Sequence, residues 1–122
     1  MVTGLDALFL EVNSLEDSLA FYHQHLGLEI DSHNPENEPP IATLRAGSLK
    51  INLVQQVETM LKRGRGVYFV LGVDEVDAVF THLAASGVVI EPPTDEGWGG
   101  RFVSVTDPDG YRLFLVEWNG KS

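Results

Sequence analysis

The chain has 122 residues, of which 43% are hydrophobic and 21% charged, and it contains no cysteine. This length suits one domain with a hydrophobic core, and a chain without cysteine has no disulfide, thiolate metal site or thiol nucleophile. The net charge of −10 argues against nucleic-acid binding, because such a surface repels phosphate groups. The same charge would attract cationic small molecules, although it also serves solubility.

The N-terminal region gives no sign of export or membrane insertion. Residues 1–10 lack the basic segment and long apolar run that mark a signal peptide. No apolar stretch approaches the roughly 20 residues that are needed to cross a bilayer. We therefore expect a cytoplasmic protein without membrane contact.

Alternating signals predict one strand, one helix and three further strands in the first half of the chain. Residues 5–12 are rich in β-favouring side chains, and Asn13 or Ser14 is expected to cap a helix that ends at Gly27. The side chains expected to form the buried stripe of this helix are Leu15, Leu19, Tyr22 and Leu26. A strand beginning at residues 28–31, a proline-rich loop at 34–40 and a hairpin of strands at 41–45 and 48–55 follow.

The second half repeats this order. A strand is predicted at residues 67–73, followed by a helix that Asp74 caps and Gly87 ends. Its buried stripe would consist of Val76, Val79, Phe80 and Leu83. We then expect a short strand at 88–90, a loop at 91–100 and a hairpin of strands at 101–106 and 111–118 around the turn DPDG.

The repeated order predicts an α+β fold with an internal duplication. We expect a single domain over residues 1–122, with module one at 1–56, a connector at 57–66 and module two at 67–120. Neither half has enough elements to bury its sheet alone. The two βαβββ modules are therefore expected to form a half-open, barrel-like mixed sheet around a concave cavity.

Three segments carry a resemblance to a known family. They are residues 10–22 (LEVNSLEDSLAFY), residues 26–28 (LGL), and residues 98–101 (WGGR) followed by 107–111 (DPDGY). Together they resemble the first strand and helix, the helix exit and the last hairpin of the vicinal oxygen chelate superfamily. This superfamily includes glyoxalase I, extradiol dioxygenases, fosfomycin resistance enzymes and bleomycin-binding proteins. The resemblance covers nearly the whole chain and implies the fold and a homodimer, but not one function.

Enzymes of this superfamily hold a divalent metal through His, Glu or Gln at four positions. Counting from the motifs places those positions at Ala7, Asn52, Tyr68 and Phe114. None is a histidine or a carboxylate, and Asn52 and Tyr68 offer only an amide oxygen and a phenol. We therefore expect neither a metal nor another cofactor. We interpret the four histidines as surface or helix-flank residues, with His33 in the flexible loop: His23, His25, His33 and His82.

Aromatic residues take the place of metal ligands in the inferred cavity. Alternate residues of a strand share a face, so we expect this cavity to be lined by Phe9, Glu11, Asn52, Tyr68, Phe114 and Trp118. Trp98, on a glycine-rich loop, could cover it. An aromatic pocket with one carboxylate suits an aromatic or cationic ligand. Alternatively, the aromatic residues fill the cavity as core, and Glu11 pairs with Lys50 or Arg45.

The leading hypothesis is a metal-free homodimer that binds a small molecule, similar to the bleomycin-resistance proteins. It assigns no catalytic residue. One alternative is a glyoxalase-type metal-dependent lyase, isomerase or dioxygenase with a non-standard site, and another is a scaffold whose cavity is filled. The sequence leaves open the ligand, whether any reaction occurs, and whether the loop 34–40 closes over a ligand.

Overall fold

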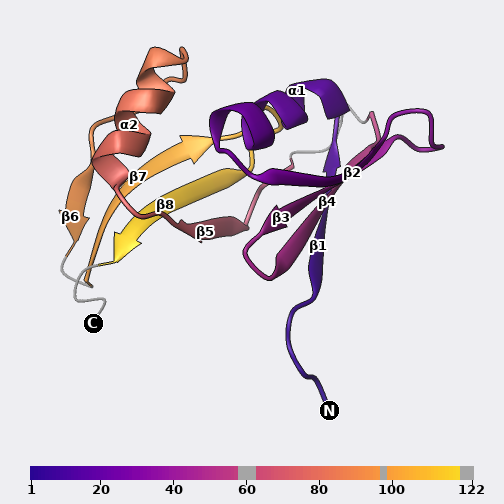
Figure 1. Cartoon of the computed structure of the whole chain (residues 1–122), viewed down its shortest axis with the longest axis horizontal. Coiled ribbons are helices and arrows are strands. Elements are labelled where there is room, and N and C mark those ends of the chain that lie inside the picture. The colour runs from indigo at the N-terminus through magenta and orange to yellow at the C-terminus, as the bar shows by residue number, and fades with distance from the viewer. Residues whose placement is uncertain (58–62, 97–98, 119–122) are drawn as a thin grey trace. The chain divides into compact units, whose positions relative to one another are not determined.

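The chain folds into two compact units, Met1–Arg63 and Gly64–Ser122. The computed structural model describes residues 1–57, 63–96 and 99–118 (Figure 1). Each unit has its own four-stranded mixed sheet, and neither sheet closes on itself. The predicted α+β fold in two modules is therefore confirmed. No helix in the described part of the chain is long and apolar enough to span a bilayer.

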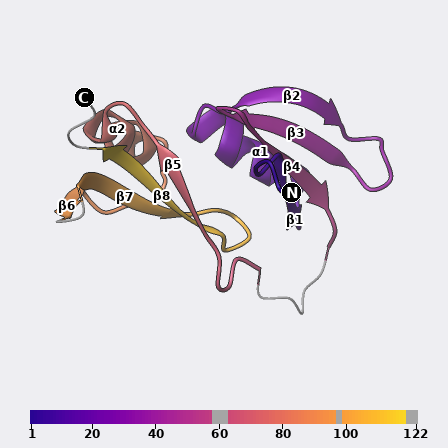
Figure 2. The ribbon, with the colours of Figure 1, turned by 90° about the horizontal axis from the view of Figure 1, so that it is seen from below.

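The first unit contains one helical segment and four strands. Its elements are β1 (Ala7–Val12), α1 (Leu15–Leu19), the π-helix η1 (Ala20–His25), β2 (Glu29–Asn34), β3 (Ile41–Ala46) and β4 (Leu49–Gln55). The strand order is β1-β4-β3-β2, in which β1 and β4 are parallel and the other pairs are antiparallel. Figure 2 shows β2, β3 and β4 side by side.

The helical segment of the first unit starts as predicted and then widens. Ser14 is the N-cap, and its side chain accepts a hydrogen bond of 3.1 Å from the Asp17 amide. From Ala20 onward the segment is a π-helix rather than the predicted α-helix, as the 3.0 Å bond from the Leu26 amide to the Phe21 carbonyl shows. This wider turn buries the adjacent side chains Phe21 and Tyr22 together, which a stripe at α-helical spacing does not anticipate.

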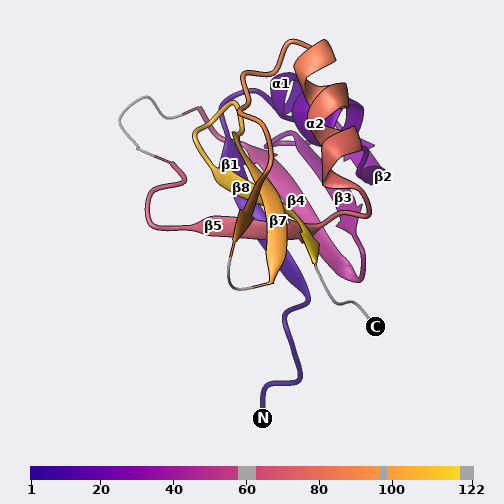
Figure 3. The same ribbon diagram turned by 90° about the vertical axis from the view of Figure 1, so that its left-hand side faces the viewer.

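The second unit repeats the architecture of the first. Its elements are β5 (Tyr68–Gly72), α2 (Val76–Ala85), β6 (Thr94–Glu96), β7 (Gly100–Thr106) and β8 (Arg112–Trp118). The strand order β5-β8-β7-β6 has the same pattern as the first sheet, with β5 and β8 parallel. Helix α2 packs against β7 and β8 on one face of this sheet (Figure 1, Figure 3).

The short strand predicted at residues 88–90 is wrong. Those residues are outside any strand, and Val89 is 97% exposed. The strand forms instead at Thr94–Glu96, within the predicted loop, where it pairs with Gly100–Phe102 of β7. A run of β-branched residues favours strand locally, but a strand needs a partner, and within residues 88–96 only residues 94–96 pair with β7.

The first amide of each helix donates a hydrogen bond to a side chain on the last strand of its own unit. The Leu15 amide donates to Oε1 of Gln55, and the Val76 amide donates to Oε1 of Glu117, both at 2.9 Å. The predicted cap by Asp74 is wrong, because the N-cap of α2 is Glu75, whose side chain makes no capping bond. The long-range acceptor satisfies an amide that a local cap would otherwise bind.

The core of each unit lies between its helix and one face of its sheet. The fully buried large residues of the first unit are Val12, Tyr22, Leu44 and Leu53, and those of the second are Val76, Leu83, Val103, Leu113, Leu115 and Val116. Among the described elements, no helix of the same unit covers the opposite face of either sheet. We call these two surfaces the helix-free faces.

Candidate ligand-binding site

The helix-free face of the first unit brings three of the predicted site residues together. Phe9 of β1 is the register partner of Asn52 in β4, and Glu11 lies two residues along the same face of β1. The Phe9 ring is 68% exposed. The side-chain oxygen Oδ1 of Asn52 accepts a 2.5 Å hydrogen bond from the Thr43 hydroxyl.

A cluster of opposite charges lies at the β2 side of this face. The Asp31 carboxylate binds the Arg45 guanidinium at 3.1 Å and the Lys50 ammonium at 3.2 Å. The register shift between Ile30 and Ser32 marks the irregularity at which Asp31 is placed. The two cations that the sequence offered as partners for Glu11 therefore pair with Asp31.

This cluster lowers the pKa of the Asp31 carboxyl group. The hydrogen bond from Lys50, followed by that from Arg45, holds the pKa of Asp31 below its ordinary value of 3.8. We expect Lys50→Met to raise this pKa more than Arg45→Met does, as measured by an NMR titration of the carboxyl carbon. Because the folded-state pKa is lowered, the stabilisation is present above the unfolded-state pKa and is lost as pH falls through the folded one. Equal, ordinary pKa values in all three proteins would contradict the cluster.

The helix-free face of the second unit carries a cluster of aromatic rings. The Tyr68 and Phe114 rings meet edge to face with centroids 5.6 Å apart, and the Phe102 and Phe114 rings meet in the same way at 5.6 Å. Tyr68 is 62% exposed and Trp118 45% exposed. Sequence analysis selected Tyr68, Phe114 and Trp118 but missed Phe102, whose strand lies next to β8.

A cation lies over this aromatic cluster. The guanidinium carbon of Arg112 is 6.0 Å from the centroid of the Tyr68 ring and 6.0 Å from that of the Phe114 ring. Arg112 also borders a hollow of about 410 Å³, together with Phe102, Ser104 and Thr94. Its position two residues before Phe114 places it on the same face, a signal that the sequence already contained.

The four positions that the family resemblance implies for a metal do not offer a metal-binding donor set. Ala7 and Phe114 have no side-chain donor atom, Asn52 offers one amide oxygen that already accepts a hydrogen bond, and Tyr68, whose ring meets Phe114 edge to face, offers only a phenol. In residues 1–57, 63–96 and 99–118, no three His, Asp or Glu side chains gather closely enough to hold an ion. Trp98 lies outside the described residues.

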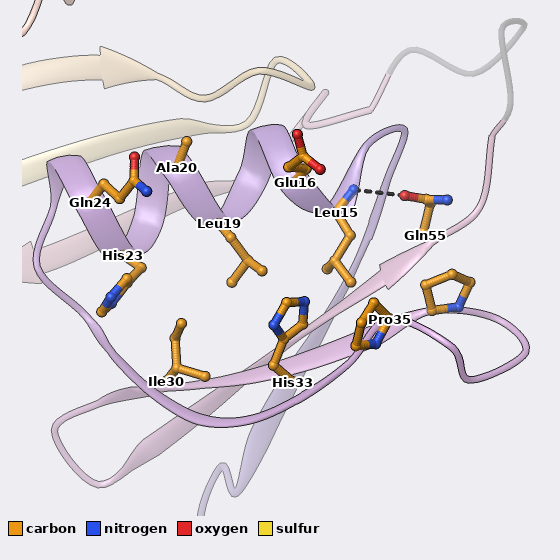
Figure 4. A pocket seen from close by; sticks show the side chains of 11 residues that line it. Leu15, Glu16, Leu19, Ala20, His23, Gln24, Ile30, His33, Pro35 and Gln55 are labelled. Atoms are coloured by element: carbon orange, nitrogen blue, oxygen red, sulfur yellow. Dashed lines mark hydrogen bonds between the residues drawn. The ribbon is translucent and has the colours of Figure 1, made fainter.

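A second hollow, of about 530 Å³, lies on the helix side of the first unit. It is bordered by apolar residues of α1 and β2, including Leu15, Leu19 and Ile30 (Figure 4). His23 and His33 reach it from the helix and the strand, and Figure 4 shows both side chains at its rim. His33 is therefore a residue of β2, and its predicted location in the flexible loop is wrong.

A backbone contact of His23 determines which of its ring nitrogens donates a hydrogen bond and which accepts one. Its Nδ1 lies 2.7 Å from the Leu28 carbonyl oxygen, which can only accept a hydrogen bond. The neutral ring thus carries its proton on Nδ1 and presents Nε2 as an acceptor. Glu16, Gln24 and Gln55 also border this hollow, so its lining combines polar with apolar side chains.

The sequence of this chain matches a known protein family. The profile of the Glyoxalase/Bleomycin resistance protein/Dioxygenase superfamily matches residues 4–115, and the chain belongs to this superfamily. No match is found among curated proteins.

Several solved structures share the fold at low sequence identity. TnmS3, an antibiotic binding protein from a Streptomyces species, is 23% identical with a TM-score of 0.81, over 97% of this chain and 98% of that one. A mutant of the fosfomycin resistance protein FosX from Listeria monocytogenes, complexed with Mn(II) and a dihydroxypropylphosphonic acid, is 19% identical with a TM-score of 0.82, over 99% and 96%. A glyoxalase/bleomycin resistance protein/dioxygenase from Nocardioides is 20% identical with a TM-score of 0.77, over 100% and 87%.

Proposed function

We propose that this protein binds an aromatic small molecule on the helix-free faces of its sheets, without a metal ion and without catalysing a reaction. The observation that carries the proposal is the cluster that the exposed Tyr68 forms with the half-buried Phe102 and Phe114. Three rings in edge-to-face contact form a rigid apolar surface that loses little conformational entropy when a flat ligand covers it. The fold shared with the antibiotic binding protein TnmS3 is compatible with this role.

The chemistry of the four inferred metal positions supports the metal-free part of the proposal. FosX has the same fold and is complexed with Mn(II), yet the positions inferred here for a metal bear a methyl, an amide, a phenol and a phenyl group. Carboxylate and imidazole are the side-chain ligands that most often hold divalent metals in proteins, and this set contains neither. The proposal thus places the protein with the binding members of the superfamily and not with its glyoxalase-type enzymes.

The proposal includes a homodimer, which the family resemblance implies. Large apolar side chains remain uncovered on the single chain, with Val70 of β5 56% exposed in addition to Phe9 and Tyr68. Uncovered apolar residues of this kind are typical of surfaces that a ligand or another chain covers. A symmetric pair is the commonest oligomer of soluble proteins.

Binding of flat aromatic probes to the purified full chain tests the proposal. We expect naphthalene derivatives to bind and Tyr68→Ala to weaken them about tenfold, because removal of one stacking ring costs about 1.4 kcal/mol. Val67→Ala is the matched control, since Val67 is the neighbouring exposed residue outside β5. Calorimetry gives both affinities, and circular dichroism confirms that each variant is folded.

Two results would overturn the proposal. One is the failure of every aromatic probe to bind, or equal binding to the wild type and Tyr68→Ala. The other is stoichiometric binding of Ni²⁺, Zn²⁺, Mn²⁺ or Fe²⁺ to the chelator-treated protein with a Kd near micromolar, about −8 kcal/mol. The latter result would restore the metal-dependent enzyme as the leading function.

A further inference from the structure

The charge of the ligand can be inferred from the cation that lies on the aromatic cluster. We propose that Arg112 binds an anionic group of the ligand, so that the ligand class is an aromatic carboxylate or a similar aromatic anion. This inference rests on the proposed function, because it concerns the same face of the second unit. It gives the ligand a charge opposite to the one that the overall acidity of the chain suggests.

The first observation is that Arg112 has no acidic partner. Within the part of the chain that the structure describes, its guanidinium forms no ion pair or hydrogen bond with a protein group. The other arginines on strands are paired: Arg45 binds Asp31, and Arg101 binds Asp77 at 2.8 Å and Asp95 at 3.3 Å. In a protein with 18 acidic residues, an exposed arginine that none of the described ones neutralises has its five donors available for a ligand.

The second observation is that Arg112 is held in place by the rings themselves. Its guanidinium lies 6.0 Å from the centroids of both Tyr68 and Phe114, a distance at which a cation is attracted to the face of a ring. A planar guanidinium that is already oriented in this way loses less conformational entropy when it forms two parallel hydrogen bonds to a carboxylate. A ligand cation would instead meet a like charge at the rings that were expected to attract it.

The third observation is the polarity of the hollow that Arg112 borders. The hydroxyls of Ser104 and Thr94 border it too and can donate to an anion, while Phe102 supplies an apolar wall. Glu91 is the one carboxylate among the described residues of this lining, and it lies on the exposed segment before β6 with no ion pair of its own. Glu91 would oppose an anion, but no ring contact holds it near the aromatic cluster.

At physiological salt, the net charge of −10 does not determine whether the ligand is an anion or a cation. Exposed charges separated by more than a Debye length, about 8 Å at 0.15 M, are largely screened from each other. A carboxylate in direct contact with Arg112 is not screened in this way, so the local pair dominates the equilibrium. The distant acidic residues would mainly slow the association of an anion.

Three naphthalene probes of the same size test the inference: 2-naphthoate, 2-naphthylmethanol and 2-naphthylmethylammonium, titrated into the full chain at 0.15 M salt. We expect the carboxylate to bind at least about tenfold more tightly than the cation, as a charge-assisted hydrogen bond would provide. Arg112→Gln should remove this preference, and Arg112→Lys should keep part of it. Arg65→Gln removes the same charge from the same unit, at a loop residue without an ion pair among those described, and should keep the preference.

The outcomes separate this inference from the function on which it rests. If the three probes bind equally to the wild type, or if Arg65→Gln and Arg112→Gln have the same effect, Arg112 is not the anion-binding residue although aromatic binding stands. If the cation binds most tightly and Glu91→Gln removes that preference, the ligand has the opposite charge. If no probe binds, both the proposed function and this inference fail.

Discussion

Gly64→Ala is expected to destabilise the protein by about 2 to 4 kcal/mol. A Cβ atom at Gly64 would lie 2.4 Å from the carbonyl oxygen of Gly110 and 2.6 Å from Cα of Tyr111. Both are backbone atoms of the turn between β7 and β8, so no side-chain rotation relieves the overlap. The backbone at Gly64 also has φ of +77°, which an L side chain adopts at a cost. Urea denaturation followed by tryptophan fluorescence measures the loss.

Gly66→Ala distinguishes the steric overlap from the backbone strain at positive φ. Gly66 has φ of +82°, close to that of Gly64, but a Cβ built on it meets nothing within 4 Å. We therefore expect Gly66→Ala to lose only the contribution from backbone strain, about 1 kcal/mol of unfolding free energy. An equal loss for both variants would show that the first segment of the second unit is not packed against the β7–β8 turn.

Asp107→Ala is expected to cost about 2 to 3 kcal/mol of unfolding free energy. Asp107 is only 4% exposed, and its Oδ1 accepts hydrogen bonds from the Asp109 amide at 2.9 Å and the Tyr111 amide at 2.8 Å. Alanine leaves both amides without this acceptor at a half-buried position. Because the turn aligns β7 with β8, the loss should also appear as faster amide hydrogen exchange at the ends of these strands.

Asp107→Asn is the matched control for this turn. The amide side chain keeps one oxygen that can accept from both backbone donors, while the second oxygen becomes an NH₂ group and the negative charge is lost. We expect it to retain at least half of the stability that alanine removes. If Asn and Ala were equally destabilising, the charge and not the local hydrogen bonding would stabilise the turn.

The parts of the fold that sequence analysis predicted correctly are governed by local chemistry. The Ser14 cap, the glycine at the end of each helix and the DPDG turn each depend on residues close in the chain. The features that it missed depend on residues far apart. The acceptors for the first helical amides, Gln55 and Glu117, lie 40 or more residues from the helices that they cap. No local signal identifies such a partner.

The candidate site likewise contains some features that local sequence patterns predict and others that depend on residues far apart in the chain. Alternation along β1, β5 and β8 correctly placed residues on a common face, because side chains of a strand alternate whatever the strand pairs with. Phe102 and Arg112 were missed because their contacts with the rings depend on which strands are neighbours and on where a long side chain points. The pairing of Asp31 with Lys50 depends on a register shift, which the sequence does not indicate. Whether the predicted residues bind a ligand stays a prediction.

The parallel pairing of the first and last strands in each unit has a consequence for the order of folding. The hairpins β3–β4 and β7–β8 join neighbouring strands through short turns, so they can form from local contacts. The pairs β1–β4 and β5–β8 close much longer loops, which costs more chain entropy and slows their formation. We expect the first strand of each unit to dock last. During synthesis, all strands of the first sheet exist once Gln55 has been added, so that sheet can assemble while the second unit is still being made.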